Sequence, residues 1–347
     1  MMPEPQVSAI VPARNEEANI AAAVESLAAQ TVPVEIIVVN DGSTDRTGAL
    51  LAELSQCIPQ LRVIEPPEPP EGWTGKNHAV VCGVAEVQAP WLLFTDADVR
   101  HAPNAVEAGL AVARKTGAAM VSYSPDQQLH TWWERATIPF VYCRLASEYP
   151  YERVSDPQDP LAAANGEWLL VSRLAYEVVG GHVAVKGEIL EDVALARRLK
   201  RSGCRLYFAR GVGLTWSRMY QRLEEMWEGW SKNLFPLFGW RKGVVAGALV
   251  GAALDALVWV FILVALWGWG QGWPVGGWTL VPLAAILGWR HLRYALALRR
   301  NGYSLACLPY YTLGSLLFAA LMVDSSTKYL SGEPVKWKGR EYAASAK

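Results

Sequence analysis

The sequence predicts an α/β fold: a mostly parallel sheet flanked by helices, followed by C-terminal transmembrane helices. Through the first half of the chain, short continuous apolar runs alternate with longer helical patterns, as in successive βαβ units. The C-terminal region is strongly apolar, and Asp255 is its only charged residue from Gly243 to Trp289. The formal net charge of −1 over 347 residues provides no global basic field, so no nucleic-acid partner is expected.

The predicted sheet begins close to the N-terminus. Its strands are continuous apolar runs, which suit strands covered on both faces, at Val7–Pro12, Val34–Asn40, Arg62–Ile64, Trp91–Thr95 and Ala119–Ser124. The helices between them are predicted at Glu17–Ala29, Thr44–Leu54, Lys76–Val87 and Pro103–Thr116. Ser43 and Thr44 are expected to supply a turn and an N-cap for the second of these helices.

The middle of the chain continues the α/β pattern. A short strand is predicted at Trp168–Val171, and an amphipathic helix at Val193–Ser202. The segment His130–Glu148 is predicted to form an amphipathic helix that either lies on the side of a ligand site or packs in the core. The five cysteines are scattered without a CxxC pair, which favours reduced thiols over a disulfide framework or a zinc site.

The C-terminal third is predicted to anchor the chain in a membrane through two to three apolar segments, near residues 243–268, 272–289 and 304–323. At ~1.5 Å per residue, the first is long enough to cross a ~30 Å hydrocarbon layer, and the other two are near the lower limit. Nine of the sixteen tryptophans lie between Trp227 and Trp289, where indoles would mark the bilayer interface. We expect a cytosolic catalytic domain at 1–235, a membrane-anchoring region at 236–330 and a basic tail at 331–347.

The positions of basic residues predict the orientation in the membrane. The N-terminus shows no signal-peptide pattern, and basic residues precede the first apolar segment and follow the second: Arg241, Lys242, Arg290, Arg293, Arg299 and Arg300. This pattern predicts a multi-pass protein of the cell membrane with its catalytic domain in the cytoplasm. Three complete spans, however, would place the basic tail outside. Either the third segment re-enters or lies in the interface, or the tail breaks the positive-inside rule.

Asp255 lies in the middle of the first apolar segment. A charged side chain that faces lipid at the centre of a bilayer costs roughly 2.5–3.5 kcal/mol. Asp255 is therefore expected to face another helix or the path of a bound ligand.

Four polar clusters follow predicted strands or precede a helix. They occupy residues 12–16 (PARNE), 40–45 (NDGSTD), 95–98 (TDAD) and 189–192 (ILED). In open α/β sheets, ligands bind beyond the carboxyl ends of the strands. The clusters are therefore expected to form one site at that edge of the sheet.

The pair Asp96 and Asp98 suggests a metal. On an extended segment alternate side chains share a face, so that both carboxylates can approach one hard cation. Mg²⁺ or Mn²⁺ takes oxygen ligands and can bridge carboxylates to the phosphates of a nucleotide. Neither GxGxxG nor GxxxxGK[ST] occurs at the first strand–helix turn, which argues against a dinucleotide oxidoreductase or a phosphate-loop NTPase.

The runs VSAIVPARNEEANI, VVNDGSTDRT, FTDADV and LEDVALARRLKRSG resemble the inverting family-2 glycosyltransferases with the GT-A fold. The resemblance covers about residues 5–235, with the motifs in the expected order. Residues 72–78 (GWTGKNH), Asn165-Gly166 and residues 179–182 (VGGH) are similar to bacterial members that glycosylate carotenoid acids and to hopanoid-associated members. The processive QxxRW motif is absent, since residues 221–227 read QRLEEMW, which argues against processive synthesis.

The resemblance implies roles for individual residues. Residues that match Pro12, Arg14, Glu16 and Asp41 line the nucleotide pocket, with the one at Asp41 on the base. Lys76 would lie near the diphosphate. Asp96 would face the ribose and the metal, Asp98 would ligate the metal, and Asp192 would be the general base.

Glu191 and Asp192 also have a rationale from the residues alone. Displacement with inversion needs a base on the acceptor side, and a helix start favours carboxylates there; simple stabilisation of the helix N-terminus is the alternative. Asn165, Gly166 and Arg218 are candidates for the acceptor side, Arg218 because it could meet an anionic acceptor. His78 and His182 could bind phosphate or metal, or be structural.

The predicted function is inverting transfer of a hexose from a nucleotide-sugar, expected to be a UDP-sugar, to a lipid acceptor such as a carotenoid or hopanoid. Two alternatives stay open. One is a polyprenyl-phosphate glycosyltransferase, which differs in the acceptor nucleophile. The other is a catalytically silent membrane subunit that binds nucleotide.

Overall fold

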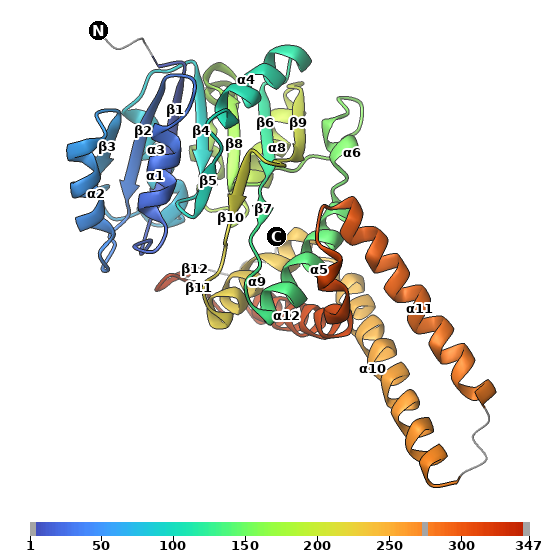
Figure 1. Cartoon of the computed structure of the whole chain (residues 1–347). Coiled ribbons are helices and arrows are strands. Elements are labelled where there is room, and N and C mark those ends of the chain that lie inside the picture. The colour runs from blue at the N-terminus through green and yellow to red at the C-terminus, as the bar shows by residue number, and fades with distance from the viewer. Residues whose placement is uncertain (1–4, 273–276, 343–347) are drawn as a thin grey trace. The chain divides into compact units, whose positions relative to one another are not determined.

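The computed structural model describes residues 5–272 and 277–342, and within it the chain groups into two compact units (Figure 1). The first unit comprises residues 1–128 and 149–219, and the second comprises residues 129–148 and 220–347. The residues at both ends and at 273–276, including the last five residues of the predicted tail, lie outside the described part.

The first unit is built on a sheet in the order β3-β2-β1-β4-β8-β6-β9. Its strands are β1 (Val7–Ala13), β2 (Val34–Asn40), β3 (Leu61–Ile64), β4 (Trp91–Thr95), β6 (Met120–Ser124), β8 (Trp168–Ser172) and β9 (Leu206–Arg210). All the predicted strands are confirmed, with limits that move by at most one residue. The buried side chains form one apolar core on each face of this sheet, which explains why the strands are apolar throughout.

Strand β8 runs against the rest of the sheet. It pairs antiparallel with β4 and with β6, whereas β1 pairs parallel with β2 and β4. Thr95, the last residue of β4, therefore lies opposite Trp168, the first residue of β8. The residues that precede β8 consequently lie at the same edge as the carboxyl ends of the parallel strands.

Helices cover both faces of this sheet (Figure 1). They are α1 (Ile20–Ala28), α2 (Thr47–Cys57), α3 (Gly75–Ala85), α4 (Ala105–Thr116), α6 (Tyr151–Ser155), α7 (Arg173–Val178), the 3₁₀ turn η1 (Gly181–Val185) and α8 (Glu191–Arg201). A small sheet, ordered β5-β10-β7, adds β5 (Val99–His101), β7 (Asp126–Gln127) and β10 (Thr215–Ser217).

The predicted cap of α2 by Ser43 and Thr44 is wrong. The helix begins at Thr47, and Arg46 occupies the N-cap position without a side-chain hydrogen bond. Ser43 instead accepts a hydrogen bond from the backbone N–H of Asn15 (3.1 Å), and the N–H of Thr44 donates to Asn15 Oδ1 (2.8 Å). These residues are used to join the loop after β1 to the loop after β2, so they are not available to the helix.

The second unit is mostly helical. Its elements are α5 (Trp132–Glu148), α9 (Leu223–Leu237), α10 (Lys242–Gly270), α11 (Gly277–Arg300), η2 (Leu305–Tyr310), α12 (Tyr311–Ser331), β11 (Val335–Trp337) and β12 (Arg340–Tyr342). Helix α12 packs against α5, α9 and α10. The expected domain limit at residue 235 falls inside α9, and α5 joins this unit although it is far away in the sequence.

Two helices in the described residues are long and apolar enough to cross a membrane: α10 and the continuous segment Leu305–Ser331. Residues 273–276 of the predicted middle apolar segment lie outside the described part, and its described helix, α11, is not one of these two. Asp255 is completely buried, and its carboxylate forms an ion pair with Arg290 of α11. The expectation that Asp255 faces another helix is therefore confirmed, and its partner is Arg290.

Candidate active site

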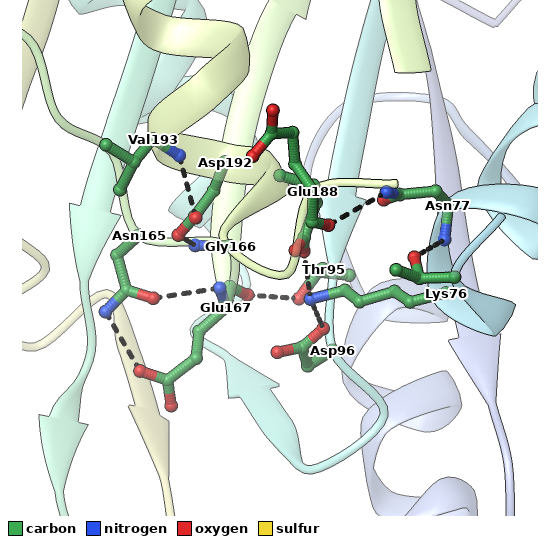
Figure 2. A network of polar contacts seen from close by, with 12 residues as sticks. Lys76, Asn77, Thr95, Asp96, Asn165, Gly166, Glu167, Glu188, Asp192 and Val193 are labelled. Atoms are coloured by element: carbon green, nitrogen blue, oxygen red, sulfur yellow. Dashed lines mark hydrogen bonds and ion pairs between the residues drawn. The ribbon is translucent and has the colours of Figure 1, made fainter. Parts of the chain in front are cut away.

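The centre of the candidate site is the ammonium group of Lys76, in the first turn of α3 (Figure 2). Its Nζ lies 2.7 Å from Asp96 Oδ1, just after β4, and 2.8 Å from Glu191 Oε1, at the start of α8. Burial opposes a charge on this amine, but the two carboxylates outweigh it and raise the pKa of Lys76 well above its usual value. One cation thus ties together three segments that are far apart in the sequence.

Asp192 lies beside this ion pair and is held by backbone donors. Its Oδ2 accepts a hydrogen bond from the N–H of Gly166 (2.8 Å), and its Oδ1 accepts from the N–H of Val193 (2.7 Å). Burial raises the pKa of Asp192 to about 7, and the neighbouring Glu191 carboxylate adds to the rise. Asp192 can therefore exchange a proton near neutral pH.

Glu191 behaves in the opposite way although it is adjacent. Burial tends to raise the pKa of Glu191, but the Lys76 ammonium outweighs that effect and holds the pKa below its usual value. The Lys76 ammonium thus gives the two neighbouring carboxyl groups different pKa values: Glu191 stays ionised near neutral pH, whereas Asp192 titrates there. Such a divergence between neighbouring acids is typical of catalytic sites.

Gly166 allows the close approach of these groups. A Cβ at this position would lie 3.2 Å from Lys76 Nζ and 3.4 Å from Asp192 Oδ2. A Cβ would therefore crowd the Lys76 ammonium and come into van der Waals contact with Asp192, so glycine suits the position.

Glu167 belongs to the site's framework, and sequence reasoning missed it. Its carboxylate is buried and accepts hydrogen bonds from Asn165 Nδ2 (2.9 Å) and Gln127 Nε2 (3.2 Å), and its carbonyl accepts from Thr95 Oγ1 (2.7 Å) (Figure 2). Burial raises the pKa of Glu167. Only the reversed direction of β8, which no local pattern predicts, places this residue beside the end of β4.

Asn77 fixes the loop that leads to the acidic pair. Its side-chain amide donates to the carbonyls of Val185, Lys186 and Glu188 at 2.9–3.1 Å. Asn77 follows Lys76 directly, so one turn of α3 both supplies the cation and restrains the segment before Glu191. Asn77 belongs to the motif at residues 72–78, but no role was predicted for it from the sequence.

A pocket brings together part of the predicted set. It is lined by Pro12, Lys76, Val80, Phe94, Thr95, Asp96, Gly166, Leu169, His182, Glu191, Asp192 and Leu195. These residues come from β1, α3, β4, β8, η1 and α8 or the loops beside them. Lys76, Glu191 and Asp192 therefore converge at the carboxyl edge of the sheet, and Gly166 is the one predicted acceptor-side residue that lines the pocket with them.

The remaining nucleotide candidates gather beyond the ends of β1 and β2. Arg14 Nη1 donates to the carbonyls of Asp41 (2.6 Å) and Gly42 (3.2 Å), and Asp41 is buried. The Glu16 carboxylate accepts a hydrogen bond from Asn19 Nδ2 (3.0 Å). These contacts order the two loops that would border a nucleotide.

Asp96 and Asp98, the predicted metal-binding pair, lie close together in the sequence but not on an extended segment. Ala97 is buried between the partly exposed Asp96 and Asp98, so both carboxylates can share one side. The reasoning from an extended segment is wrong, because Ala97 and Asp98 form a turn rather than a continuation of β4. In the described residues, no group of three or more His, Cys, Asp or Glu side chains forms a ready metal site.

Two further candidates, Arg218 and His182, differ in their position relative to the pocket. In the part of the chain that the structure describes, Arg218 is not among the pocket-lining residues; it directly follows β10. His182 lines the pocket, but its Nδ1 contacts the Tyr176 hydroxyl (3.0 Å), and burial lowers the pKa of His182 to about 4. A neutral, hydrogen-bonded imidazole is better suited to shaping the pocket than to holding phosphate by charge.

Comparison with known proteins shows which family the N-terminal half of the chain resembles. Residues 8–170 match the family described as "Glycosyl transferase family 2". The chain therefore contains a family 2 glycosyltransferase domain, and its fold is of the GT-A type.

Individual relatives extend the match over almost the whole chain. The chain is homologous to 4,4'-diaponeurosporenoate glycosyltransferase of Staphylococcus aureus: it is 27% identical to the protein of strain MRSA252 over 341 residues, 97% of this chain and 88% of the relative. The protein of strain USA300 is 26% identical over the same shares. A Pyrobaculum calidifontis mannosyltransferase, solved with GDP-Man and Mn²⁺, has the same fold: TM-score 0.56, 18% identity, covering 95% of this chain and 88% of that chain.

The ion pair at the centre of the site makes a first prediction. Lys76→Met leaves the buried Glu191 carboxylate without its cation. The free energy of unfolding at pH 8 should therefore fall by about 1–3 kcal/mol, less than for a fully buried pair, because solvent screens the partly exposed Lys76 ammonium. Removal of the cation raises the pKa of Glu191 in the folded state. The loss should therefore be smaller at pH 5.5, where Glu191 can be protonated.

Thermal unfolding of wild type and variant at both pH values provides the measurement. Arg62→Met is the matched control, because Arg62 pairs with Glu86 at 2.8 Å on the surface, with both side chains about half exposed. It should change stability little at either pH. Equal effects of the two substitutions would contradict a central role for Lys76.

Proposed function

We propose that this chain transfers a hexose, with inversion, from a nucleotide-sugar of the UDP type to a hydrophobic lipid acceptor such as a carotenoid acid or a hopanoid. One observation carries the proposal: a carboxyl group that titrates near pH 7, Asp192, lies beside a fixed cation, Lys76, in a pocket at the carboxyl ends of the strands. The family 2 domain supports the reaction class, and the relatives support the acceptor class.

The two charged groups would divide the work of a single displacement. An acceptor oxygen attacks the anomeric carbon, the bond from that carbon to the diphosphate oxygen breaks, and the nucleoside diphosphate leaves. Lys76 would counter the negative charge of the diphosphate, which is the role expected of a preorganised cation. Asp192 would take the proton of a hydroxyl acceptor, because a base with a pKa near the working pH is the most effective.

The acceptor decides how much Asp192 contributes. The S. aureus relatives are named for diaponeurosporenoate, a carboxylate, which is already ionised near neutral pH. A hopanoid-type hydroxyl, by contrast, depends on a base. The pKa of Asp192 favours a hydroxyl, whereas the homology favours a carboxylate, and one substitution distinguishes the two.

A divalent metal fits the residues that are present. Mg²⁺ and Mn²⁺ are often held by one or two carboxylates together with substrate phosphates rather than by a complete protein cage. Asp98, with Asp96 beside it, offers such an incomplete set of oxygen ligands. The metal would supply neutralisation of the charge on the leaving diphosphate. The mannosyltransferase of the same fold was solved with Mn²⁺.

The cell membrane is the proposed location, with the family 2 domain on the cytoplasmic side. Helix α10 supports this proposal, because it exposes large apolar side chains along most of its length. A nucleotide-sugar donor would then be supplied from the cytosol, and a lipid acceptor from the bilayer.

Asp192→Asn tests the base. With a hydroxyl acceptor, single-turnover transfer should fall roughly 10²–10⁴-fold while nucleotide binding is kept. In the wild type the rate should rise with pH through about 7, because Asp192 must be ionised to accept a proton, and this dependence should disappear in the variant. Rapid-quench measurement of sugar transfer between pH 5.5 and 9 provides both results.

The same variant distinguishes the acceptor classes. With a carboxylate or phosphate acceptor the loss should be much smaller, since the nucleophile is already ionised. Glu177→Gln is the control: Glu177 is an exposed carboxylate of α7 that pairs only loosely with Arg173 (3.4 Å), and it should behave as wild type. If Asp192→Asn transfers to a hydroxyl acceptor at the wild-type rate, Asp192 has no part in the mechanism.

Asp98→Ala tests the metal. Because Asp98 would supply one of few protein ligands, Mn²⁺-dependent binding of UDP should weaken about 10-fold or more, equivalent to ~1.4 kcal/mol. Calorimetric titration with UDP, with and without Mn²⁺, measures this directly. Asp156→Ala, in a loop after α6, should leave the Mn²⁺ effect intact. An unchanged Mn²⁺ effect in Asp98→Ala would remove Asp98 from the metal site.

A further inference from the structure

We propose that the hairpin of α10 and α11 dips into the bilayer and returns without crossing it, and that α12 does not cross either. The protein would then be anchored from one side rather than multi-pass. This inference rests on the membrane location proposed above and adds the depth and topology of the anchor. Figure 1 shows α10 and α11 running side by side away from the other helices of the second unit.

The far end of the hairpin exposes apolar side chains. Beyond Asp255, α10 exposes Leu257, Trp259, Val260, Phe261, Leu263, Val264, Leu266, Trp267 and Trp269, and the described side chains of α11 add Val281, Ile286 and Trp289. Each of these is at least 40% exposed. So many large apolar side chains on one projecting element indicate contact with lipid rather than water.

In the described residues, each arm of the hairpin is too short to cross the bilayer when measured from the level of the Asp255–Arg290 ion pair. In α11 the apolar arm extends from Gly277 to Trp289, because Arg290 follows. At ~1.5 Å per residue this is about 20 Å, against a hydrocarbon core of ~30 Å. In α10 the part beyond Asp255 extends to Gly270, which is about 22 Å by the same rise. A hairpin is limited by its shorter arm, and any tilt would shorten its reach further.

An ion pair lies at the level where the apolar arm of α11 ends, although α10 is apolar on both sides of it. Asp255 and Arg290 lie at the same level on the two helices, and a second contact between them measures 2.9 Å. Arg290 also donates to the carbonyl of Gly251 (3.2 Å) and lies over the ring of Tyr311. Asp255 is buried in this pair, but the Arg290 side chain is 24% exposed, and a charge that faces lipid at the bilayer centre costs ~2.5–3.5 kcal/mol. The pair therefore favours a position near the interface.

The basic residues of α11 lie on the same side of this pair. Arg293 is exposed three residues beyond Arg290, and the helix ends in Arg299 and Arg300. Such residues suit the anionic headgroups of the leaflet that the hairpin enters. Full insertion of α11 would instead draw Arg290 and Arg293 into the hydrocarbon.

Helix α12 belongs to the folded unit. In its most apolar stretch 44% of the residues are buried by other parts of the chain, compared with 17% for α10. Its Asp324 accepts a hydrogen bond from Trp227 Nε1 (2.9 Å) and pairs with Lys328 (2.8 Å). The uncharged run of this segment ends at Val323, directly before this charged pair, and α12 packs against α5, α9 and α10 rather than standing alone as α10 does beyond Asp255.

This arrangement removes the conflict over the tail. If α10 and α11 return to the side of entry and α12 does not cross, Lys336, Lys338 and Arg340 stay on that side with Arg241 and Lys242. All the basic flanks then agree with the positive-inside rule.

Cysteine accessibility tests the proposal. In a full-length chain whose five native cysteines are replaced by serine or alanine, Gln271→Cys places a thiol at the tip of the hairpin, and Lys336→Cys is the matched control in the tail. Inside-out and right-side-out membrane vesicles are treated with a membrane-impermeant maleimide. The tip should react only after detergent is added, and the tail only in inside-out vesicles.

Two results obtained without detergent would overturn the inference. Reaction of the tip cysteine in right-side-out vesicles would mean that the hairpin crosses the membrane. Reaction of the tip cysteine in inside-out vesicles would mean that the tip stays in water. Retention of the chain in the membrane after a carbonate wash separates failure of this inference from failure of the proposed membrane location. If the cysteine-free chain does not bind UDP, the accessibility test is repeated with the native chain carrying a protease site inserted after Gln271. Protection of this site from protease on both sides of the membrane supports the proposal. Cleavage from either side contradicts it.

Discussion

The candidate site depends on one ammonium group held between two carboxylates. Lys76 contacts Asp96 beyond β4 and Glu191 at the start of α8, and it keeps Glu191 ionised while the adjacent Asp192 titrates near neutral pH. Without this cation, three carboxylates would face one another in a partly buried pocket, at an electrostatic cost that the fold could not easily support. The same charge arrangement that stabilises the edge of the sheet also provides a base and a counter-charge for a diphosphate. Stability and proposed catalysis therefore have a common physical origin.

Much of the fold could be predicted because its signals are local. Strands buried on both faces have continuous apolar runs, and β1, β2 and β4 follow those runs to within one residue. The direction of β8 could not be predicted in this way, because an apolar run of five residues looks the same in either direction. Its reversal is what brings Gly166 and Glu167 beside Thr95. The cap of α2 failed for a related reason: Ser43 and Thr44 carry a helix-start pattern, but tertiary contacts with Asn15 use their hydrogen-bonding groups.

Several residues that the motifs mark lie together in the structure, whereas residues that only geometry brings to the site could not be predicted. Lys76, Asp96, Gly166, Glu191 and Asp192 converge in one pocket, while the supporting residues Asn77 and Glu167 became visible only through contacts over long sequence separations. The partner of Asp255 required the hairpin of α10 and α11, which returns Arg290 to the same level. In both units, then, the unpredicted features are pairings of charged or polar groups across the fold, for which sequence spacing carries no signal.

The most direct test of this account is the titration of the Asp192 carboxyl group itself. Carbon-13 NMR of aspartate-labelled protein, with Asp192→Asn to assign the signal, measures its pKa in the wild type and in Glu191→Gln. The account predicts a pKa of about 7 in the wild type, and a lower value in Glu191→Gln because the neighbouring negative charge is removed. An ordinary aspartate pKa near 4 in both proteins would contradict it, since Asp192 would then be an unperturbed carboxylate with no special relation to Glu191 and Lys76.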